Sequence, residues 1–492
     1  MKHTNKNTKK ILALVLSALM LLAALVACAD PEDPKGDGTK APNGTGTATD
    51  TVDDSGPNLP DIKFTGRTIT SASSERWEFV LEDDTENQEA LSAAKYRAGA
   101  NVEERFDIEL ASWLVPDNNS AELATRVIES AMAGDYEYDY VFPHVIYGVA
   151  EMIIQNCLVD YNTLKYVDME KPWWYKDANE QLALGDKSYY ATGDLNVDGT
   201  SVVLYVANKA LLNDIGYDKD LYQVVFDGDW TCDEVLAINA LASKDLDGDL
   251  EITPENDQYG TLLIPGYTGH VFALGQRLTE RNADGLPEFV VNTPHMYEVI
   301  EKFAKLAYDD GTYFEDVGSS TFANSEYYRI MKEGRAVLMN TELGMYRYIR
   351  GLDFDYLLLP LAKYDDKQED YMEYVGTGLI GVCATNRDMD CADAVLEALS
   401  YEYHKIVRPA FYNDVLGQKV AQDENSQKML DLMFDSIVYD PGINYEQTLT
   451  ADTVLYKVAI LRKGEGASSF IQKIEGTLDM LMKNMHEKLY NR

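Results

Sequence analysis

The chain has 492 residues, of which 46% are hydrophobic and 11% aromatic, so it can build large buried cores. It carries 83 acidic residues against 43 lysines and arginines, which gives a formal net charge of −40. That charge would repel nucleic acid and anionic lipid, so both are excluded as partners. Neutral or cationic solutes and divalent cations remain compatible with it.

The N-terminus has the pattern of an export signal. Several lysines precede an apolar stretch, Ile11 to Ala27, which is too short for a confident membrane-spanning helix and fits the hydrophobic region of a signal peptide. The stretch ends in Leu-Val-Ala-Cys, which resembles a bacterial lipobox. We therefore expect residues 1–27 to be a lipoprotein signal peptide and Cys28 to be lipidated. A plain secretory signal with an accidental cysteine is the alternative.

Residues 28–60 indicate a disordered tether. Gly, Thr, Pro and Asp dominate this segment, and no large apolar residue occurs between Cys28 and Val52. Such a segment cannot bury enough apolar surface to offset the entropy lost on ordering. A lipid, a tether and a globular body form the layout of a receptor held at the extracellular face of a cell membrane.

Four cysteines follow the tether: Cys157, Cys232, Cys383 and Cys391. They are widely spaced and form no CxxC motif, so neither a zinc site nor a redox motif is indicated. Outside the cell a disulfide is permitted, and Cys383 with Cys391 is the only near pair. Four buried free thiols is the other interpretation, and the sequence leaves both open.

The first part of the globular body alternates strands and helices. We expect strands at 67–70, 107–111 and 138–142, separated by helices at 89–106 and 120–132. This alternation predicts a parallel α/β sheet, with ligand-binding loops at the carboxyl ends of the strands.

Further along, the apolar run Val202 to Ala207 predicts a buried strand that leads into a helix at Lys209. Thr231 has the position of a helix N-cap, with Glu234 at the capping-box position. A strand, loop, helix and strand are expected between Gly334 and Asp365. The clearest closing helices are at 392–403 and 470–490.

Several of these segments together resemble the extracellular solute-binding proteins of ABC importers, family 1, in the maltose-binding-like branch. The segments that carry the resemblance are YDYVFPHVIYGVAEMIIQNCLVDY, VLYVANKALLNDIGY, GDWTCDEVLAI and GTGLIGVCATNRDMDCADAVLEALSYEY, in that order. Together with NVEERFDIEL and KPWWYKDAN, they look like a Firmicutes lipoprotein subgroup.

The resemblance implies a periplasmic-binding-protein-like type II fold, with two α/β lobes, a hinge and an interlobe cleft. Lobe 1 would comprise residues 61–200 and 351–405, lobe 2 residues 201–350, and residues 406–492 would form C-terminal helices packed mainly on lobe 2. The implied function is capture of a carbohydrate or similar small polar solute by hinge closure, for delivery to an ABC permease. We expect a monomer that is not an enzyme.

The resemblance also places the ligand-binding residues in loops around the cleft. The candidates are Ser73, Ser74, Trp77, Phe142, His144, Tyr147, Asp194, Asn196, Tyr267, Glu342, Tyr346 and Thr377. Flat aromatic faces suit the C–H surfaces of sugars, and short polar groups suit hydroxyls. Pro143-His144 stands where sugar-binding relatives have an acid and a tryptophan, so maltodextrin itself is not the expected ligand. Trp173 and Trp174 are expected to pack against the hinge.

An acidic loop predicts a structural calcium site in lobe 2. Asp245, Asp247, Asp249 and Glu251 alternate as in an EF-hand loop, and Ca²⁺ prefers six to eight oxygen ligands. Position six is Leu250 rather than glycine, and position twelve is Asn256. We therefore take Asp257 as the last ligand, with Glu255 as the alternative. A solvated acidic turn is the competing interpretation, although acids this close repel one another without a cation.

The common sequence motifs of hydrolases, metalloproteases and nucleotide-binding enzymes are absent: there is no GxSxG, HExxH or Walker A. With 83 acidic residues, a pair of carboxylates suited to glycoside hydrolysis is uninformative. A surface glycan hydrolase or lyase, and a surface adhesin, are the alternatives to the receptor.

Overall fold

The computed structural model describes residues 56–75, 90–116, 119–199, 201–264, 267–315, 321–417, 421, 423–449 and 463–490. The predicted signal peptide, Cys28, most of the tether and Trp77 lie outside these ranges. Within them, no helix combines the length and apolar character that a membrane crossing requires.

Lobe 1 is built on a four-stranded sheet in the order β12-β3-β1-β2. Its strands are β1 (Thr68–Ser74), β2 (Glu109–Val115), β3 (Tyr140–Phe142) and β12 (Gly381–Val382). β1 is parallel to both β2 and β3, whereas β12 is antiparallel to β3. The predicted alternation of strands and helices is confirmed, because α2 (Ala90–Phe106) and α3 (Ser120–Ala133) connect these strands and pack on them.

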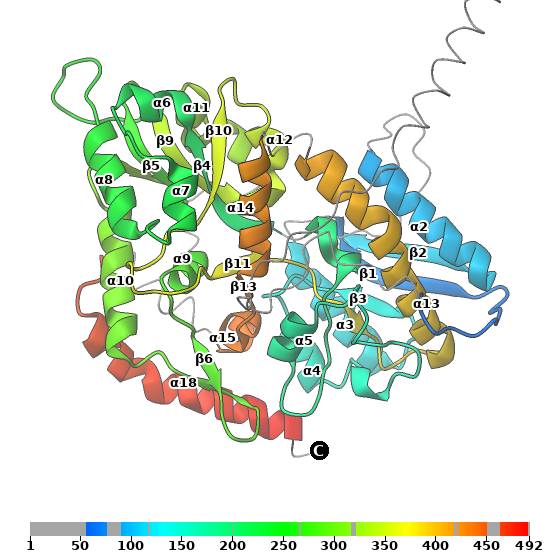
Figure 1. Ribbon diagram of the computed structural model, residues 1–492. Coiled ribbons are helices and arrows are strands. Elements are labelled where there is room, and N and C mark those ends of the chain that lie inside the picture. Colours follow the sequence, from blue (N-terminus) through cyan, green and yellow to red (C-terminus); the bar gives the residue numbers. More distant parts are fainter. Residues whose placement is uncertain are drawn as a thin grey trace, which may run out of the picture. The chain divides into compact units, whose positions relative to one another are not determined.

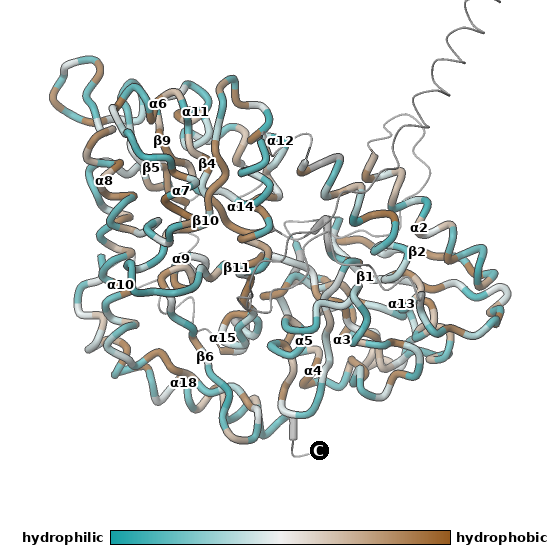
Figure 2. Tube along the Cα trace, in the orientation of Figure 1, coloured by the Kyte–Doolittle hydropathy of each residue, from teal (hydrophilic) through white to brown (hydrophobic). Residues whose placement is uncertain are grey.

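Lobe 2 is built on a seven-stranded mixed sheet (Figure 1). Its strands are β4 (Ser201–Asn208), β5 (Tyr259–Leu263), β8 (Thr312–Phe314), β9 (Ala336–Glu342), β10 (Tyr356–Pro360), β11 (Glu373–Gly376) and β13 (Ile437–Val438). Every residue from Val202 to Ala207 is buried, so both faces of β4 are covered. A strand covered on both faces needs a continuous apolar run rather than an alternating one, as this sequence has. Figure 2 shows this hydrophobic character along β4 and β10.

The remaining elements cover the two sheets. Lobe 1 also has α4 (Val149–Ile154), α5 (Lys176–Leu182), α13 (Met389–Glu402) and the π-helical turns η7 (Tyr403–Val407) and η8 (Ala410–Gly417). Lobe 2 has α6 (Lys209–Asp214), α7 (Leu221–Phe226), α8 (Cys232–Ala242), α9 (Tyr267–Ala273), α10 (Pro294–Ala307), α11 (Glu326–Lys332), α12 (Tyr346–Ile349) and the hairpin β6 (Thr279–Arg281) to β7 (Pro287–Phe289). Short 3-10 turns are η3 (Tyr161–Thr163), η4 (Asp194–Gly199), η5 (Phe322–Asn324) and η6 (Leu343–Met345).

Of the two features predicted at the start of α8, the N-cap at Thr231 is confirmed and the capping box with Glu234 is not. The Thr231 side chain accepts a hydrogen bond from the Glu234 N–H, as an N-cap does. The Glu234 carboxylate does not complete a capping box. It accepts hydrogen bonds from Tyr217 Oη at 2.7 Å and Lys219 Nζ at 2.8 Å instead. The Glu234 carboxylate therefore pairs with the Lys219 cation from the preceding segment, which is a stronger, charge-assisted interaction than a capping-box bond to the Thr231 N–H.

The boundary predicted for the return to lobe 1 is wrong. Strand β10 was placed in lobe 1 with residues 351–405, but it pairs antiparallel with β4 of lobe 2, and β11 pairs with the same edge of β4. The chain rejoins lobe 1 only after β11, where β12 pairs with β3. The buried Glu373 carboxylate fixes this path, because its Oε1 accepts the Leu361 N–H at 2.9 Å and so joins the end of β10 to the start of β11.

The C-terminal helices contact both lobes, whereas we expected them mainly on lobe 2. They are α14 (Glu424–Asp435), α15 (Pro441–Asn444), α16 (Glu446–Leu449) and α18 (Ala467–Tyr490). α14 packs on β10 of lobe 2, but α16 contacts α4 of lobe 1. α18 contacts both α10 of lobe 2 and α4 of lobe 1 (Figure 1).

All four cysteines of the globular body are free and buried in the structure, and Cys383 and Cys391 are not bridged. The neighbour of Cys383 is instead the segment around Cys157, because Ala384 N donates to Cys157 O at 2.8 Å. Burial raises the pKa of the Cys391 thiol to about 12, so this thiol is protonated at neutral pH.

Trp173 and Trp174, predicted to pack against the hinge, contact α13 and the residues at the start of η4. Both indole N–H groups donate to the buried carboxylate of Glu397, at 3.1 and 2.9 Å. Trp174 pairs with Gly193, and the Asp194 N–H donates to Trp173 O at 2.9 Å. A Cβ at Gly193 would lie 2.3 Å from Trp173 O, so only glycine fits there.

Glu397 should make stability depend on pH. Burial raises the pKa of this carboxyl to about 7, although the two indoles and the Asp168 N–H favour its charged form. In the unfolded chain this carboxyl has its ordinary pKa of 4.5. The contribution of Glu397 to the free energy of unfolding is therefore fully present below pH 4.5 and is lost as the pH rises through 7. We expect the free energy of unfolding to fall by about 3 kcal/mol between pH 4.5 and 7, measured by urea denaturation.

The matched variant is Glu397→Gln, which cannot titrate. Other buried carboxyls also change charge in this range, so the comparison is the difference between the two pH profiles rather than the wild-type profile alone. The variant should have a flatter profile over that interval. Identical slopes in the two proteins would contradict the assignment.

Candidate functional site

The carboxyl ends of β1 and β3 bring several predicted residues together. Ser73 is the direct register partner of Phe142 in the parallel pair of β1 and β3. Ser73 and Ser74 are fully buried, and neither hydroxyl has a hydrogen-bond partner among the described residues. An unpaired buried hydroxyl is uncommon and costs free energy, so each occurrence requires an explanation such as an absent ligand or water.

The segment after β11 crosses beside this edge. His144 forms a bridge with Gly378, and the Val145 N–H donates to Thr377 O at 2.9 Å. Asn196 Nδ2 donates to Gly378 O at 2.7 Å. Asn196, Thr377 and His144 were predicted separately from three distant segments, and the structure places them around one short stretch of backbone.

The same pairings continue into lobe 2. Gly376 is the register partner of Ser201, and two residues along β4, Val203 is the partner of Glu342 at the end of β9. Tyr346 follows in α12, where the Arg350 guanidinium lies 5.5 Å from its ring centroid. An uninterrupted set of backbone pairings therefore connects the predicted residues of β1 with those of β9.

The aromatic and polar groups on this path suit a polar solute with apolar C–H faces. The rings of His144 and Tyr147 lie 5.2 Å apart, and both side chains are half-buried. Glu342 and Tyr346 are also half-buried, whereas Phe142 and Thr377 are fully buried. Stacking faces next to short hydrogen-bonding groups are what carbohydrate recognition requires.

Asp194 has a structural role that the sequence did not reveal. It is fully buried, and its Oδ1 accepts a hydrogen bond from Tyr175 Oη at 2.8 Å. Its Oδ2 lies 2.5 Å from His404 Nδ1 and 3.5 Å from Arg408 Nη1. A buried carboxylate needs such partners to offset desolvation. No local pattern could have indicated His404 and Arg408, because more than 200 residues separate them from Asp194.

The side chains of two predicted residues cannot be placed relative to the others. Trp77 lies outside the described residues, and for Tyr267 the structure describes only the backbone, at the start of α9. A cavity of about 290 Å³ lies elsewhere and contains none of the predicted residues. It is lined by Gln181, Arg277, Thr279, Glu280, Arg281, Pro287, Tyr439 and Pro441.

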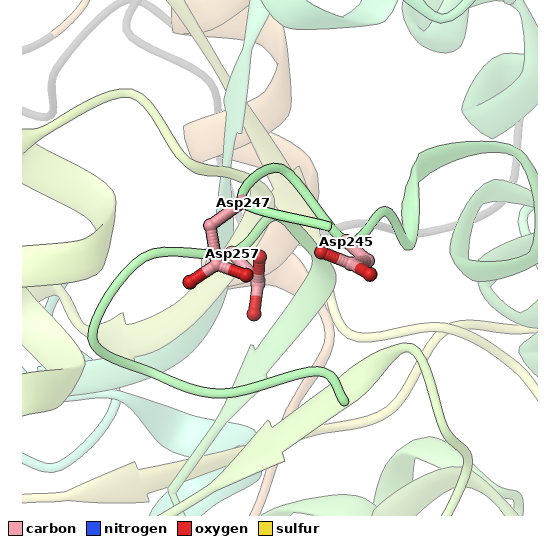
Figure 3. A group of neighbouring side chains, drawn as sticks. All are labelled: Asp245, Asp247 and Asp257. Carbon is pink, nitrogen blue, oxygen red and sulfur yellow. The ribbon is translucent and has the colours of Figure 1, made fainter. Parts of the chain in front are cut away.

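The acidic loop brings three of its five predicted ligands together. One carboxylate oxygen from each of Asp245, Asp247 and Asp257 lies within 4.8 Å of the others (Figure 3). Asp249 and Glu251 are not members of this group, and Asp249 Oδ1 accepts the Glu251 N–H at 2.9 Å. Of the five predicted ligands, these three converge in the structure, whereas Asp249 and Glu251 lie outside the group.

The loop turns at Leu250 and is held by hydrogen bonds to the Asp245 carboxylate. Leu250, at the position where the EF-hand has glycine, has φ 73° and is 93% exposed. The Asp245 carboxylate accepts the N–H groups of Gly248 and Leu250, at 2.6 and 2.8 Å. Hydrogen bonds from the Leu246 and Thr253 N–H groups hold the pKa of Asp257 below its usual value, so this carboxylate is charged at neutral pH.

Comparison with known proteins shows the fold. No family model matches the sequence, and no curated protein matches it closely enough to be called a relative. Solved structures do match. A substrate-binding protein of Listeria monocytogenes, in complex with cycloalternan, is 14% identical with a TM-score of 0.56, and the match covers 85% of this chain and 99% of that one.

Two further structures agree. The GacH receptor of Streptomyces glaucescens, solved unliganded and with acarbose, is 14% identical, with a TM-score of 0.58 and coverage of 86% and 100%. A cyclo/maltodextrin-binding protein with maltotetraose is 14% identical, with a TM-score of 0.58 and coverage of 85% and 96%. The chain therefore has the α/β fold of ABC-transporter substrate-binding proteins. Within that class, its fold is the maltose-binding-like one that the resemblance implied.

Proposed function

We propose that this chain is a receptor that captures a carbohydrate or similar small polar solute and delivers it to an ABC permease. The observation that supports the proposal is the series of backbone pairings from β1 through the segment after β11 to β9, because the strands and loops along it carry the predicted polar and aromatic residues. The solved structures with this fold are described as binding proteins, and their carbohydrate ligands support the same solute class here.

The proposed site divides its residues into two groups. Asn196 and Asp194 already hold the crossing segments through hydrogen bonds to Gly378, Tyr175 and His404, so they position the site. The hydroxyls of Ser73 and Ser74 and the rings of His144 and Tyr147 are the groups proposed to contact the solute. Hinge closure would bring Glu342 and Tyr346 onto the same solute from lobe 2.

The first test is a thermal-shift screen with maltotetraose, cycloalternan, acarbose, monosaccharides, amino acids and peptides. A ligand that binds the native state raises the melting temperature by mass action, so one carbohydrate class should give a saturable rise. For that ligand, His144→Ala should weaken binding at least about tenfold in calorimetry, because it removes one of the two paired rings.

His295→Ala is the matched control. His295 is also half-buried, and its ring lies 5.1 Å from an aromatic ring, that of Tyr364 in lobe 2. This variant should bind as the wild type does. Equal affinity losses in both variants would show that His144 does not contact the solute. Breakdown of an offered glycan, with no saturable shift in melting temperature, would contradict the receptor proposal and indicate an enzyme.

We also propose that Cys28 is lipidated and holds the receptor at the extracellular face of the membrane. In cells, Cys28→Ser should move the protein from the membrane fraction to the soluble fraction, because serine lacks the thiol that the lipid would modify. Immunoblots of the two fractions measure this. Continued membrane association of the serine variant would exclude a thioether-linked anchor.

A structural calcium ion at Asp245, Asp247 and Asp257 is a separate proposal. Three carboxylate oxygens that converge within 4.8 Å repel one another, and a hard divalent cation would relieve this repulsion. The loop's own oxygens and water would complete the coordination. The ion would brace the loop between α8 and β5.

Calcium should raise the melting temperature of the wild type by several degrees relative to chelator-treated protein. Asp247→Asn should abolish this rise, whereas Asp249→Asn should keep most of it, because Asp249 lies outside the converging group. Differential scanning fluorimetry with calcium or chelator distinguishes the two variants. A calcium response that survives Asp247→Asn undiminished would refute the site.

A further inference from the structure

The hairpin formed by β6 and β7 makes contacts to lobe 1 that the crossing segments do not make. The hairpin lies between α9 and α10 in the chain, and both of these helices belong to lobe 2. Its partner is the end of α5 and the turn that follows it. That turn belongs to lobe 1, since Asn162 Nδ2 donates to Asp186 O at 3.0 Å and Tyr161 N donates to Ser188 O at 2.7 Å.

Arg281 makes the principal contact. Its Nη2 donates to the carbonyl oxygens of Glu180, Gln181 and Ala183, at 2.7, 2.9 and 2.7 Å. These carbonyls lie at the C-terminal end of α5, where helical carbonyls lack partners and carry partial negative charge. An arginine of lobe 2 therefore caps a helix of lobe 1.

The backbone makes a second contact at the hairpin turn. Gly185 N donates to Gly285 O at 3.2 Å, and a Cβ at Gly285 would lie 3.3 Å from Gly185 Cα. Gly285 has φ 74°. A larger residue would be strained and crowded there, so the close approach of the two turns depends on glycine. Arg281 Nη1 donates to Gly285 O at 2.6 Å and so ties the guanidinium to this turn.

A third contact lies beside the first two. Arg277 Nη1 donates to Tyr439 O at 3.2 Å and to Gln181 Oε1 at 3.5 Å, and Tyr439 N donates to the same Gln181 oxygen at 3.0 Å. The cavity of about 290 Å³ lies here, and its walls come from α5 on one side and from the hairpin and residues 439–441 on the other.

The base of the hairpin is held by buried hydrogen bonds to the segment that follows β13 of lobe 2. The buried Asp440 carboxylate accepts hydrogen bonds from the N–H groups of Leu278 and Thr279 at 2.9 and 3.1 Å, and from the Thr279 hydroxyl at 2.7 Å. α15 and α18 also pack against β7, and α18 in addition contacts α4 of lobe 1. A change in the position of the lobes would therefore break the contacts at α5 before it distorted the hairpin.

We propose that the β6–β7 hairpin is a clamp between the two lobes, with Arg281 as its main contact, and that it sets how readily they move apart. This inference deepens the proposed receptor function, because hinge movement is what such a receptor uses. The contacts are hydrogen bonds between a cation and neutral carbonyls, so they can break and re-form without leaving a buried charge unpaired.

The test measures the distance between the lobes without any solute. Nitroxide labels on Arg97→Cys in α2 and Lys209→Cys in α6, both exposed positions, report this distance by pulsed electron paramagnetic resonance. The chain carries Cys28→Ser, and its other four cysteines are buried, so the two introduced thiols take the label. Arg281→Ala should broaden the distance distribution and shift its mean, and should speed hydrogen exchange at Gly185 N at least tenfold.

Lys63→Ala is the matched control. Lys63 Nζ donates to Glu104 O and Arg105 O, at 2.9 and 2.7 Å, and so caps the end of α2 with a cation inside lobe 1 alone. This variant should leave the distance distribution and the Gly185 exchange rate unchanged. If Arg281→Ala does not fold, Arg281→Gln, which keeps the stem and one donor group, must give a smaller change of the same kind.

The outcomes separate the clamp from the receptor function. An unchanged distance distribution in the arginine variants would overturn the clamp, even if exchange at Gly185 became faster, because the hairpin would then be only a local contact. A changed distribution together with no carbohydrate binding would keep the clamp and reject the proposed solute. Carbohydrate binding with an unchanged distance distribution would keep the proposed solute and reject the clamp.

Discussion

The pairing of β4 with its three neighbours is the constraint on which the rest of the molecule depends. β4 pairs with β9 on one edge and with β10 and β11 on the other, and its residues from Val202 to Ala207 are buried. It follows η4 at the crossing between lobes, so its register fixes where both crossing segments lie. A shift of one residue would turn every buried side chain of β4 to the opposite face, which the packed core on both sides forbids.

The crossing segments are held in turn by buried polar groups rather than by apolar packing alone. α13 and η7 form one continuous helical stretch, and it supplies both Glu397, which binds the indoles of Trp173 and Trp174, and His404, which binds Asp194. Buried carboxylates of this kind add little net stability, but they permit only one arrangement of their donors. These fixed points keep the segments that bridge the two lobes in one arrangement.

Sequence patterns predicted the elements well and the sheets less well. The apolar run of β4, the alternation of strands and helices in lobe 1, and the N-cap at Thr231 all depend on neighbouring residues, which the sequence displays. The run Tyr356–Pro360 was equally clear as a buried strand, but nothing in it indicates that its partner is β4. The partners of Asp194 and the contacts of Arg281 were hidden for the same reason, since both join segments about 100 to 210 residues apart.

For the candidate site, as for the sheets, the residue types could be predicted from the sequence but their spatial partners could not. The sequence indicated which residue types lie near the crossings, but not which of them retain hydrogen-bonding capacity for a solute. Asn196 donates to Gly378 O, and Asp194 contacts three protein side chains, so these polar groups already have protein partners. The buried hydroxyls of Ser73 and Ser74 have none among the described residues. Because unpaired buried hydroxyls are costly, a solute hydroxyl at the end of β1 would gain a hydrogen bond and also remove an existing penalty. If the proposed solute binds at the end of β1, its affinity would therefore depend more on these two hydroxyls than on the number of polar residues near the crossings.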